Sequence, residues 1–185
     1  MNNFRLKNFT MHNLKKYKYL YFSLGTTLLM VSYLRFFLSD FSKCFSVEIG
    51  INSLGLTFYY TVEIVKGFFE SRTLEQLICY REFLQIWDPI FAIFYTLMYS
   101  SWIIYFFKNK YYFLVVPILV MITDWAENYI ELMMLENFIN LDILSPTLVS
   151  FGSGINALRW LLFSVIYLLI IIGIVRAIKI YYAKP

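Results

Sequence analysis

The fold is decided by residues 112–135, which read YFLVVPILVMITDWAENYIELMML. A helix needs about 20 mostly apolar residues to cross a bilayer, and this stretch is long enough. It nevertheless contains three acids, although a charge near the centre of a spanning helix costs about 2.5–3.5 kcal/mol. We therefore expect a membrane helix whose acids face protein, water or a ligand instead of lipid.

The polar side chains of this stretch recur at helical spacing. Asp124, Glu127, Asn128 and Glu131 fall on one narrow face of a helix with a period of 3.6 residues. Ionisable groups inside a membrane mark functional sites by default. This acidic face is therefore the first candidate site.

Composition places the whole chain among integral membrane proteins. Of 185 residues, 60% are hydrophobic and 15% are charged, and the mean hydropathy is +0.63. A soluble domain of this length cannot bury so much apolar surface. The sequence predicts an all-α four-helix membrane bundle with a short helical cap on the non-cytoplasmic side. We expect a single domain, 1–185, with spans at about 18–38, 88–107, 112–135 and 151–175 and the cap at 40–84.

The distribution of charge predicts which ends face the cytoplasm. Five Lys or Arg and no acid precede the first apolar run, and Lys108 and Lys110 lie between the second and third runs. The segment between the third and fourth runs carries Glu136 and Asp142 but no Lys or Arg. By the positive-inside rule, both termini are cytoplasmic. Because topology accounts for the basic N-terminus, we expect no nucleic-acid partner.

The cysteines and the histidine give little sign of metal or redox chemistry. Cys44 and Cys79 both fall on the expected non-cytoplasmic side, where a disulfide is allowed. Spacing alone does not establish a bridge, so two unpaired cysteines are the favoured interpretation. With His12 as the single histidine and no CxxC element, we expect neither a metal site nor a cofactor.

Two helix starts are predicted inside the cap. Thr61 is a candidate N-cap for a short amphipathic helix that reaches Phe69. Thr73 and Gln76 have the spacing of a capping box, which opens a second helix. Together these helices are expected to lie on the outer membrane surface over the bundle, and the alternative is a peripheral segment that only connects the spans.

Asp88 and Pro89 predict the start of the second span, because proline at the first helical position lacks an amide that would be unpaired there. Capping is the favoured role for Asp88. The alternative is a buried acid, since Tyr95 continues its face down the helix. In the third span, Pro117 lies on the same face as Asp124, and we expect a kink toward the polar site.

The fourth span supplies the expected counter-charge. Asn156 and Arg159 share a face of this helix, and Arg159 is the natural partner for the third-span acids. Gly152 and Gly154 are expected to let another helix approach closely.

Acids outnumber bases at this predicted site. A bare carboxylate in a low dielectric is costly and takes up a proton or a cation instead. We therefore expect a protonated carboxyl or a bound cation. The acids are Asp88, Asp124, Glu127 and Glu131, and the bases are at most Arg159 and Arg35, which otherwise reaches the headgroups or pairs with Asp40.

Three classes of function fit this pattern, beside a purely structural network that locks the helices together. We expect a protein that binds a membrane lipid headgroup, a small hydrophobic ligand or a partner membrane helix. One alternative is a lipid-modifying enzyme with a carboxyl as general acid or base, and another is a proton or cation transporter. The candidate catalytic residues are Asp124, Glu127 and Arg159, and the candidate binding residues are Asp88, Tyr95, Asn128, Glu131 and Asn156.

The same residues resemble a set of small four-span bacterial membrane proteins. The resemblance covers about residues 55–175 and implies the four-span architecture, the bacterial inner membrane and the polar site, but no activity. That family often has Thr and Lys where this chain has Asn156 and Arg159. Arg does not deprotonate in proteins, so this departure weakens an enzyme interpretation that needs a Lys. The shared elements are Phe58-Tyr59-Tyr60, Tyr80-Arg81, Asp88, Tyr95, Asp124-x-x-Glu127-Asn128 and Asn156-x-x-Arg159.

Overall fold

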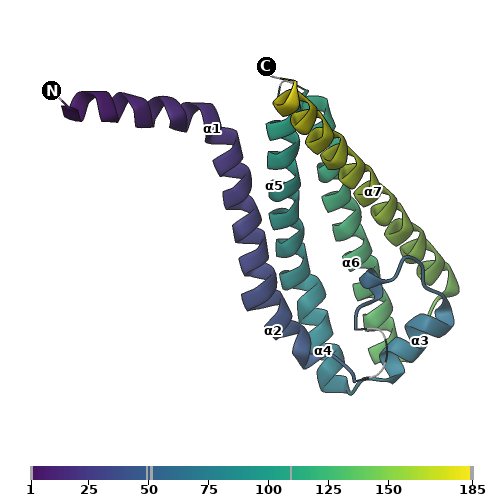
Figure 1. Ribbon diagram of the computed structural model, residues 1–185. Helices are drawn as coiled ribbons and strands as arrows, with labels where there is room; N and C mark the ends of the chain where they lie inside the picture. Colours follow the sequence, from purple (N-terminus) through teal and green to yellow (C-terminus); the bar gives the residue numbers. More distant parts are fainter. Residues whose placement is uncertain (1, 49, 51, 109, 184–185) are drawn as a thin grey trace.

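The computed structural model describes residues 2–48, 50, 52–108 and 110–183, and within these ranges it contains helices and loops but no strand (Figure 1). The predicted all-α fold is therefore confirmed. The α-helices are α1 (Asn2–Tyr33), α2 (Ser39–Phe41), α3 (Val62–Glu70), α4 (Leu74–Glu82), α5 (Asp88–Phe107), α6 (Val115–Leu141) and α7 (Pro146–Tyr182). Short π or 3-10 segments are η1 (Leu34–Leu38), η2 (Ser42–Cys44), η3 (Leu54–Leu56), η4 (Phe83–Trp87) and η5 (Tyr111–Leu114).

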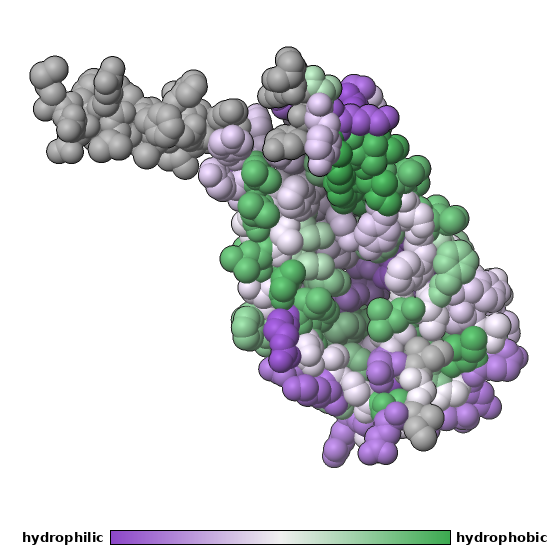
Figure 2. All heavy atoms as spheres, in the orientation of Figure 1, coloured by the Kyte–Doolittle hydropathy of each residue, from purple (hydrophilic) through white to green (hydrophobic). Residues whose placement is uncertain are grey.

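Four segments are long and apolar enough to cross a membrane, as the sequence predicted. They are Tyr17–Cys44, Leu74–Phe107, Tyr111–Leu141 and Pro146–Lys179. Large apolar side chains cover the outside of these helices, and Leu28, Leu161 and Leu168 are each more than half exposed. Figure 2 shows a hydrophobic patch over the upper part of α7, with hydrophilic atoms above it near the C-terminal end of the helix. The bundle therefore presents an apolar surface to its surroundings.

Figure 1 shows α2, α3, α4 and the turn between α6 and α7 at one end of the bundle and the C-terminus at the other. We call the first of these the cap end. The most extensive helix pairs are α6 with α7 and α1 with α5. Hydroxyl groups support the second pair, since Thr26 Oγ1 lies 2.8 Å from Ser101 Oγ and Trp102 donates to Thr27 at 2.9 Å.

The second candidate span is longer than the sequence predicted. α4 continues through the π segment η4 into α5, so Asp88 lies within a continuous helix and caps no helix start. The amide of Asp88 bonds to the carbonyl of Phe83 in the wider π turn, immediately before Pro89, which has no amide to donate. The real start of this helix is the Thr73 capping box, where both reciprocal bonds form. The capping prediction for Thr73 is confirmed and that for Asp88 is wrong.

The third candidate span has no proline kink. α6 begins at Val115, so Pro117 lies in its first turn, where the missing amide would be unpaired in any case. The Pro117 carbonyl accepts a bond from Thr96 Oγ1 at 3.4 Å. The expected bend toward Asp124 is therefore not found, and α6 runs as one α-helix to Leu141.

The cap end has its own hydrophobic core, and a disulfide closes it. Cys44 and Cys79 are bridged, which joins η2 to α4 and corrects the favoured prediction of two unpaired cysteines. Phe45 lies beside this bridge and is 1% exposed. Arg72 fixes the same region, because its Nε donates to the Phe45 carbonyl at 2.9 Å and its guanidinium lies over the Phe68 ring. Thr61 caps α3 as predicted.

Candidate functional site

The acidic face of α6 is turned into the bundle. Asp124, Glu127, Asn128 and Glu131 are 3%, 0%, 6% and 1% exposed, respectively. Their helical spacing therefore does place them on one buried face, as predicted. Tyr129, between two of them in the sequence, is 64% exposed, so the burial belongs to this face and not to the helix as a whole.

Arg159 of α7 is the counter-ion of this face. Its Nη1 donates to Asp124 Oδ1 and lies 2.7 Å from Glu127 Oε2. The second nitrogen, Nη2, donates to the Gly55 carbonyl at 2.5 Å and to Asn156 Oδ1 at 2.9 Å. Arg159 is 6% exposed, so these contacts lie where solvent screens them little. The predicted pairing of the third and fourth spans is confirmed.

The loop around η3 is held against the same part of α7. The Thr57 carbonyl accepts bonds from Asn156 Nδ2 at 2.6 Å and from Trp160 Nε1 at 3.0 Å. The Tyr60 amide donates to Ser153 Oγ at 3.0 Å. This loop therefore lies over the Arg159 guanidinium as part of the site. Sequence reasoning missed these contacts, since nothing in the spacing of either segment indicates a pairing about a hundred residues apart.

Two glycines make this close approach possible. A Cβ on Gly55 would lie 3.0 Å from Arg159 Nη2, and one on Gly152 would lie 2.7 Å from Tyr60 Oη and 2.9 Å from Ile130 Cγ2. Gly152 therefore behaves as predicted. Gly154 does not, because a Cβ there would meet nothing within 4 Å.

A second polar pair lies deeper toward the cap end. Tyr80 donates to Glu131 Oε2 at 2.5 Å, and both residues are almost fully buried. Tyr60 packs nearby, and burial, reinforced by the negative charges of Glu131 and Glu127, raises the pKa of its phenol. Tyr80 was not among the predicted site residues. The position of Tyr80 follows from the continuation of α4 into α5, which places this tyrosine at the level of the α6 acids.

Asp88 of α5 also belongs to the site, beside the residues of α6 and α7. Its Oδ2 accepts a bond from Asn128 Nδ2 at 2.9 Å, and within the described part of the chain it forms no ion pair. The predicted alternative, a buried acid on the face of Tyr95, is therefore close to its actual position, although Asp88 is only partly buried and lines a cavity with Tyr95. Arg35 does not reach this cluster. It lies exposed on η1, and Asp40 pairs with Lys43 at 2.5 Å instead.

The site borders a cavity of about 510 Å³, which Asp88, Asp124 and Arg159 line together. Side chains of α1 and α7 form opposite walls, among them Met30 and Phe163. Figure 2 shows hydrophilic atoms at the bottom of a hollow in the side of the bundle, with an apolar rim. Glu127, Glu131 and Asn128 do not line this cavity. The site therefore has an open part and a sealed part.

Several buried polar atoms of the site lack a hydrogen-bond partner among the described residues. Asp124 Oδ2 and Tyr95 Oη are two of them, and both residues line the cavity. Buried polar atoms are normally satisfied, so unpaired acceptors beside a cavity point to a ligand or water. Within the described ranges, no group of three or more His, Cys, Asp or Glu residues has an arrangement that could hold a metal ion.

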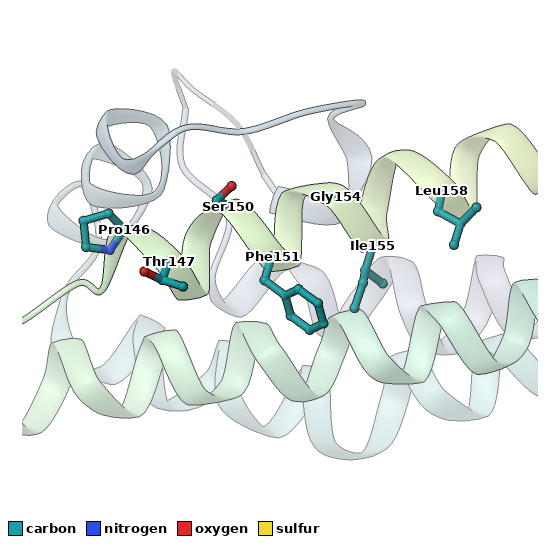
Figure 3. A pocket seen from close by; sticks show the side chains of 7 residues that line it. All are labelled: Pro146, Thr147, Ser150, Phe151, Gly154, Ile155 and Leu158. Atoms are coloured by element: carbon teal, nitrogen blue, oxygen red, sulfur yellow. The ribbon is translucent and has the colours of Figure 1, made fainter.

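A second hollow, of about 670 Å³, follows the first turns of α7 (Figure 3). Its lining carries no ionisable side chain, and Phe151 and Leu158 are 63% and 47% exposed. In Figure 3, Ser150 points to one side of α7 while Phe151 and Ile155 point to the other. This second hollow therefore lacks the convergent polar groups that mark a binding site.

Comparisons with known proteins add no relative from which a role for these residues follows. No family model, no curated protein and no solved structure matches this chain. The geometry of the site is therefore what supports a function.

Proposed function

We propose that this protein is a four-span membrane protein that binds an amphiphilic membrane lipid, with the lipid headgroup at Asp88 and Asp124 and its hydrocarbon part between α1 and α7. The observation that carries the proposal is the cavity of about 510 Å³ that combines the carboxylates of Asp88 and Asp124 with largely apolar walls. A ligand that fills it needs a polar end and an apolar body, which describes a lipid.

The membrane setting of this proposal rests on three features. Four segments are long and apolar enough to span a bilayer, and large apolar side chains cover their outer faces. The basic residues favour cytoplasmic termini, in the bacterial inner membrane. The Cys44–Cys79 bridge supports the same orientation, because the cap end would then lie in an oxidising compartment where disulfides persist. Reporter fusions at both termini and in the turn between α6 and α7 test this orientation.

The side position of the cavity favours a ligand that arrives from the bilayer. Leu34 of η1, which continues α1, and Tyr167 of α7 line it and are 41% and 47% exposed on the outside of the bundle. A lipid would therefore pass between these two helices without leaving the hydrocarbon region. Its headgroup would replace water at the carboxylates, and its chains would cover apolar walls.

Photocrosslinking tests the proposal directly. The full chain in lipid nanodiscs is irradiated with a phospholipid that carries a diazirine on its acyl chain, and labelled peptides are mapped by mass spectrometry. We expect saturable labelling of the α1 and α7 walls. A Met30→Trp variant should reduce it by filling the cavity, whereas Leu28→Trp, which changes an exposed residue outside the lining, should not. Labelling that is spread evenly over the outer surface and insensitive to Met30→Trp would refute the proposal.

A lipid-modifying enzyme is the second candidate, because an unpaired Asp124 oxygen and the Tyr95 hydroxyl line the same cavity. Such a pair can exchange a proton with a bound substrate. Mass spectrometry of lipids incubated with the protein distinguishes the two, since binding alone changes no lipid mass. The transporter alternative has less support. Residues 89–107, 111–123 and 160–175 contain no acid that would continue a path toward the other end of the bundle.

A further inference from the structure

Provided that the cavity binds a membrane amphiphile, as proposed above, we infer that the group it selects is a primary ammonium, as carried by an amine-headgroup lipid. The observation behind this inference is the kind of hydrogen-bonding atom that the cavity offers. Besides the serines and Asn52 of residues 39–53, it presents the carboxylates of Asp88 and Asp124, an unpaired Tyr95 hydroxyl and aromatic faces.

The acceptors come from three side chains on α5 and α6. Asp88 has a carboxylate with one amide donor and no ion pair among the described residues. Asp124 Oδ2 and Tyr95 Oη have no partner in the described chain, and both residues are 3% exposed. A tyrosine hydroxyl both donates and accepts, so it suits an N–H group on one side and a carboxylate on the other.

Arg159 does not turn this cavity into an anion site. Both of its terminal nitrogens are engaged, one with Asp124 and Glu127 and the other with the Gly55 carbonyl and Asn156. Its Nε is the one guanidinium nitrogen without a partner in the described chain. A phosphate or carboxylate ligand beside Arg159 would therefore find a single unpaired guanidinium N–H and would face the carboxylates of Asp88 and Asp124, which repel it.

Aromatic rings complete the environment that a cation prefers. The ring of Tyr95 lies 5.5 Å from that of Phe91 and 5.3 Å from that of Phe163, measured between centroids, and all three residues line the cavity. The faces of such rings attract a cation that is held within about 6 Å. The rings and the carboxylates therefore favour the same charge.

The unpaired acceptors distinguish a primary from a quaternary ammonium. A trimethylammonium group would use the rings but would leave Asp124 Oδ2 and Tyr95 Oη without a donor. A primary ammonium carries three N–H donors, as the Lys side chain does, and can satisfy both oxygens and Asp88 together. Because a buried acceptor without a donor is costly, the primary ammonium is selected.

Native mass spectrometry of the full chain in detergent tests this selection with lipids of identical acyl chains. Phosphatidylethanolamine has the primary ammonium, phosphatidylcholine is its trimethylated counterpart, and phosphatidylglycerol has no cation. We expect phosphatidylethanolamine to bind about tenfold more tightly than phosphatidylcholine, which corresponds to one hydrogen bond to a charged group, and phosphatidylglycerol to bind most weakly.

The possible results separate this inference from the proposed function. Saturable binding with no preference for phosphatidylethanolamine, or with a preference for either other lipid, overturns the ammonium inference but leaves lipid binding intact. No saturable binding of any of the three overturns both. Dodecylamine, a single-chain primary amine, then identifies the source. If it displaces phosphatidylethanolamine at equal concentration, a small amphiphilic amine is enough to occupy the cavity. If it does not, binding requires the whole lipid.

A pair of matched variants ties the preference to the cavity. Tyr95→Phe removes a buried hydroxyl that has no protein partner and lines the cavity, and Tyr60→Phe removes one that has no partner and lies outside the lining. Neither change should lower the melting temperature, because neither breaks a hydrogen bond. We expect Tyr95→Phe to weaken phosphatidylethanolamine binding about tenfold and to leave phosphatidylcholine binding unchanged. Equal effects of the two variants would overturn the inference.

Discussion

Replacement of Arg159 by methionine should destabilise the protein more than any other single change in the site. Methionine keeps much of the side-chain volume, but Asp124 and Glu127 would lose their shared counter-ion. Removal of one partner from a buried ion pair costs about 3–5 kcal/mol, because the remaining charge has no compensation. The upper part of this range applies here, since Arg159 also donates to the Gly55 carbonyl and to Asn156.

The assay is thermal unfolding of the purified full chain in a mild detergent. For a chain of 185 residues, each kcal/mol shifts the melting temperature by about 2–4 °C, so a cost of about 4–5 kcal/mol gives an expected decrease of about 8–20 °C. Arg176→Met provides the matched control, because this arginine lies on the same helix but is exposed. It should change the melting temperature by no more than about 2 °C.

A second variant separates the loss of charge from the loss of packing. In the double variant Arg159→Met with Glu127→Gln, one of the two uncompensated carboxylates is gone, so at least about 1 kcal/mol should be recovered relative to Arg159→Met alone. The reasoning would be refuted if Arg159→Met and Arg176→Met lowered the melting temperature equally. It would also be refuted if Glu127→Gln further destabilised the Arg159→Met protein.

Three further predictions concern the scaffold of the site. Gly152→Ala should lower the free energy of unfolding by about 1–3 kcal/mol, because its Cβ would lie 2.7 Å from a tyrosine hydroxyl. Gly154→Ala adds a Cβ in open space and should be neutral or slightly stabilising. Thermal unfolding of the two variants side by side checks this. Tyr80→Phe removes the donor 2.5 Å from a buried carboxylate and should cost about 1.5–3 kcal/mol in the same assay, without changing lipid preference. Cys44→Ser with Cys79→Ser removes a bridge between residues 35 apart and should lower the free energy of unfolding by about 3–4 kcal/mol. A reductant should lower the melting temperature of the parent protein and leave that of the double variant unchanged.

Local periodicity was sufficient to predict the acidic face. Asp124, Glu127 and Glu131 recur at the helical period within one long apolar run, and their burial agrees with the cost of leaving a charge on an apolar outer surface. Arg159 was identified by the same reasoning on the neighbouring span. Such predictions succeed because they depend on the geometry of a single helix and on the cost of exposed charge, and both can be read without knowing the tertiary structure.

The start of the second span shows where a local signal is overridden. Asp88 before Pro89 is a strong helix-start pattern, yet the chain is already helical there, because the π segment η4 accommodates a residue without an amide. A continuous helix at Asp88 is accompanied by a long-range contact. The Tyr33 hydroxyl donates to the Trp87 carbonyl at 2.8 Å and joins α1 to this turn. Contacts between residues 54 apart in the sequence leave no trace in local spacing.

The loop over Arg159 and the disulfide were inaccessible for a related reason. Gly55 and Thr57 contribute backbone carbonyls, and a carbonyl has the same chemistry in every residue, so sequence does not mark it as a site component. The bridge between Cys44 and Cys79 depends on α4 folding back beside η2, with the two Cα atoms 6.3 Å apart. Both features arise from long-range packing of the cap end.

The division of the acidic face into an open and a sealed part explains why one arginine can serve a site with four acids. Arg159 is committed to the protein, since it joins α6, α7 and the loop, and Glu131 accepts a bond from Tyr80 at one of its two oxygens. Asp88 is left with one amide donor, and Asp124 with one unpaired oxygen, both beside the cavity. Glu127 and Glu131 also have oxygens without a hydrogen-bond partner among the described residues, so what distinguishes Asp88 and Asp124 is their position beside the cavity. This access of two of the four acids to the cavity, and not their degree of hydrogen bonding, supports a binding site there.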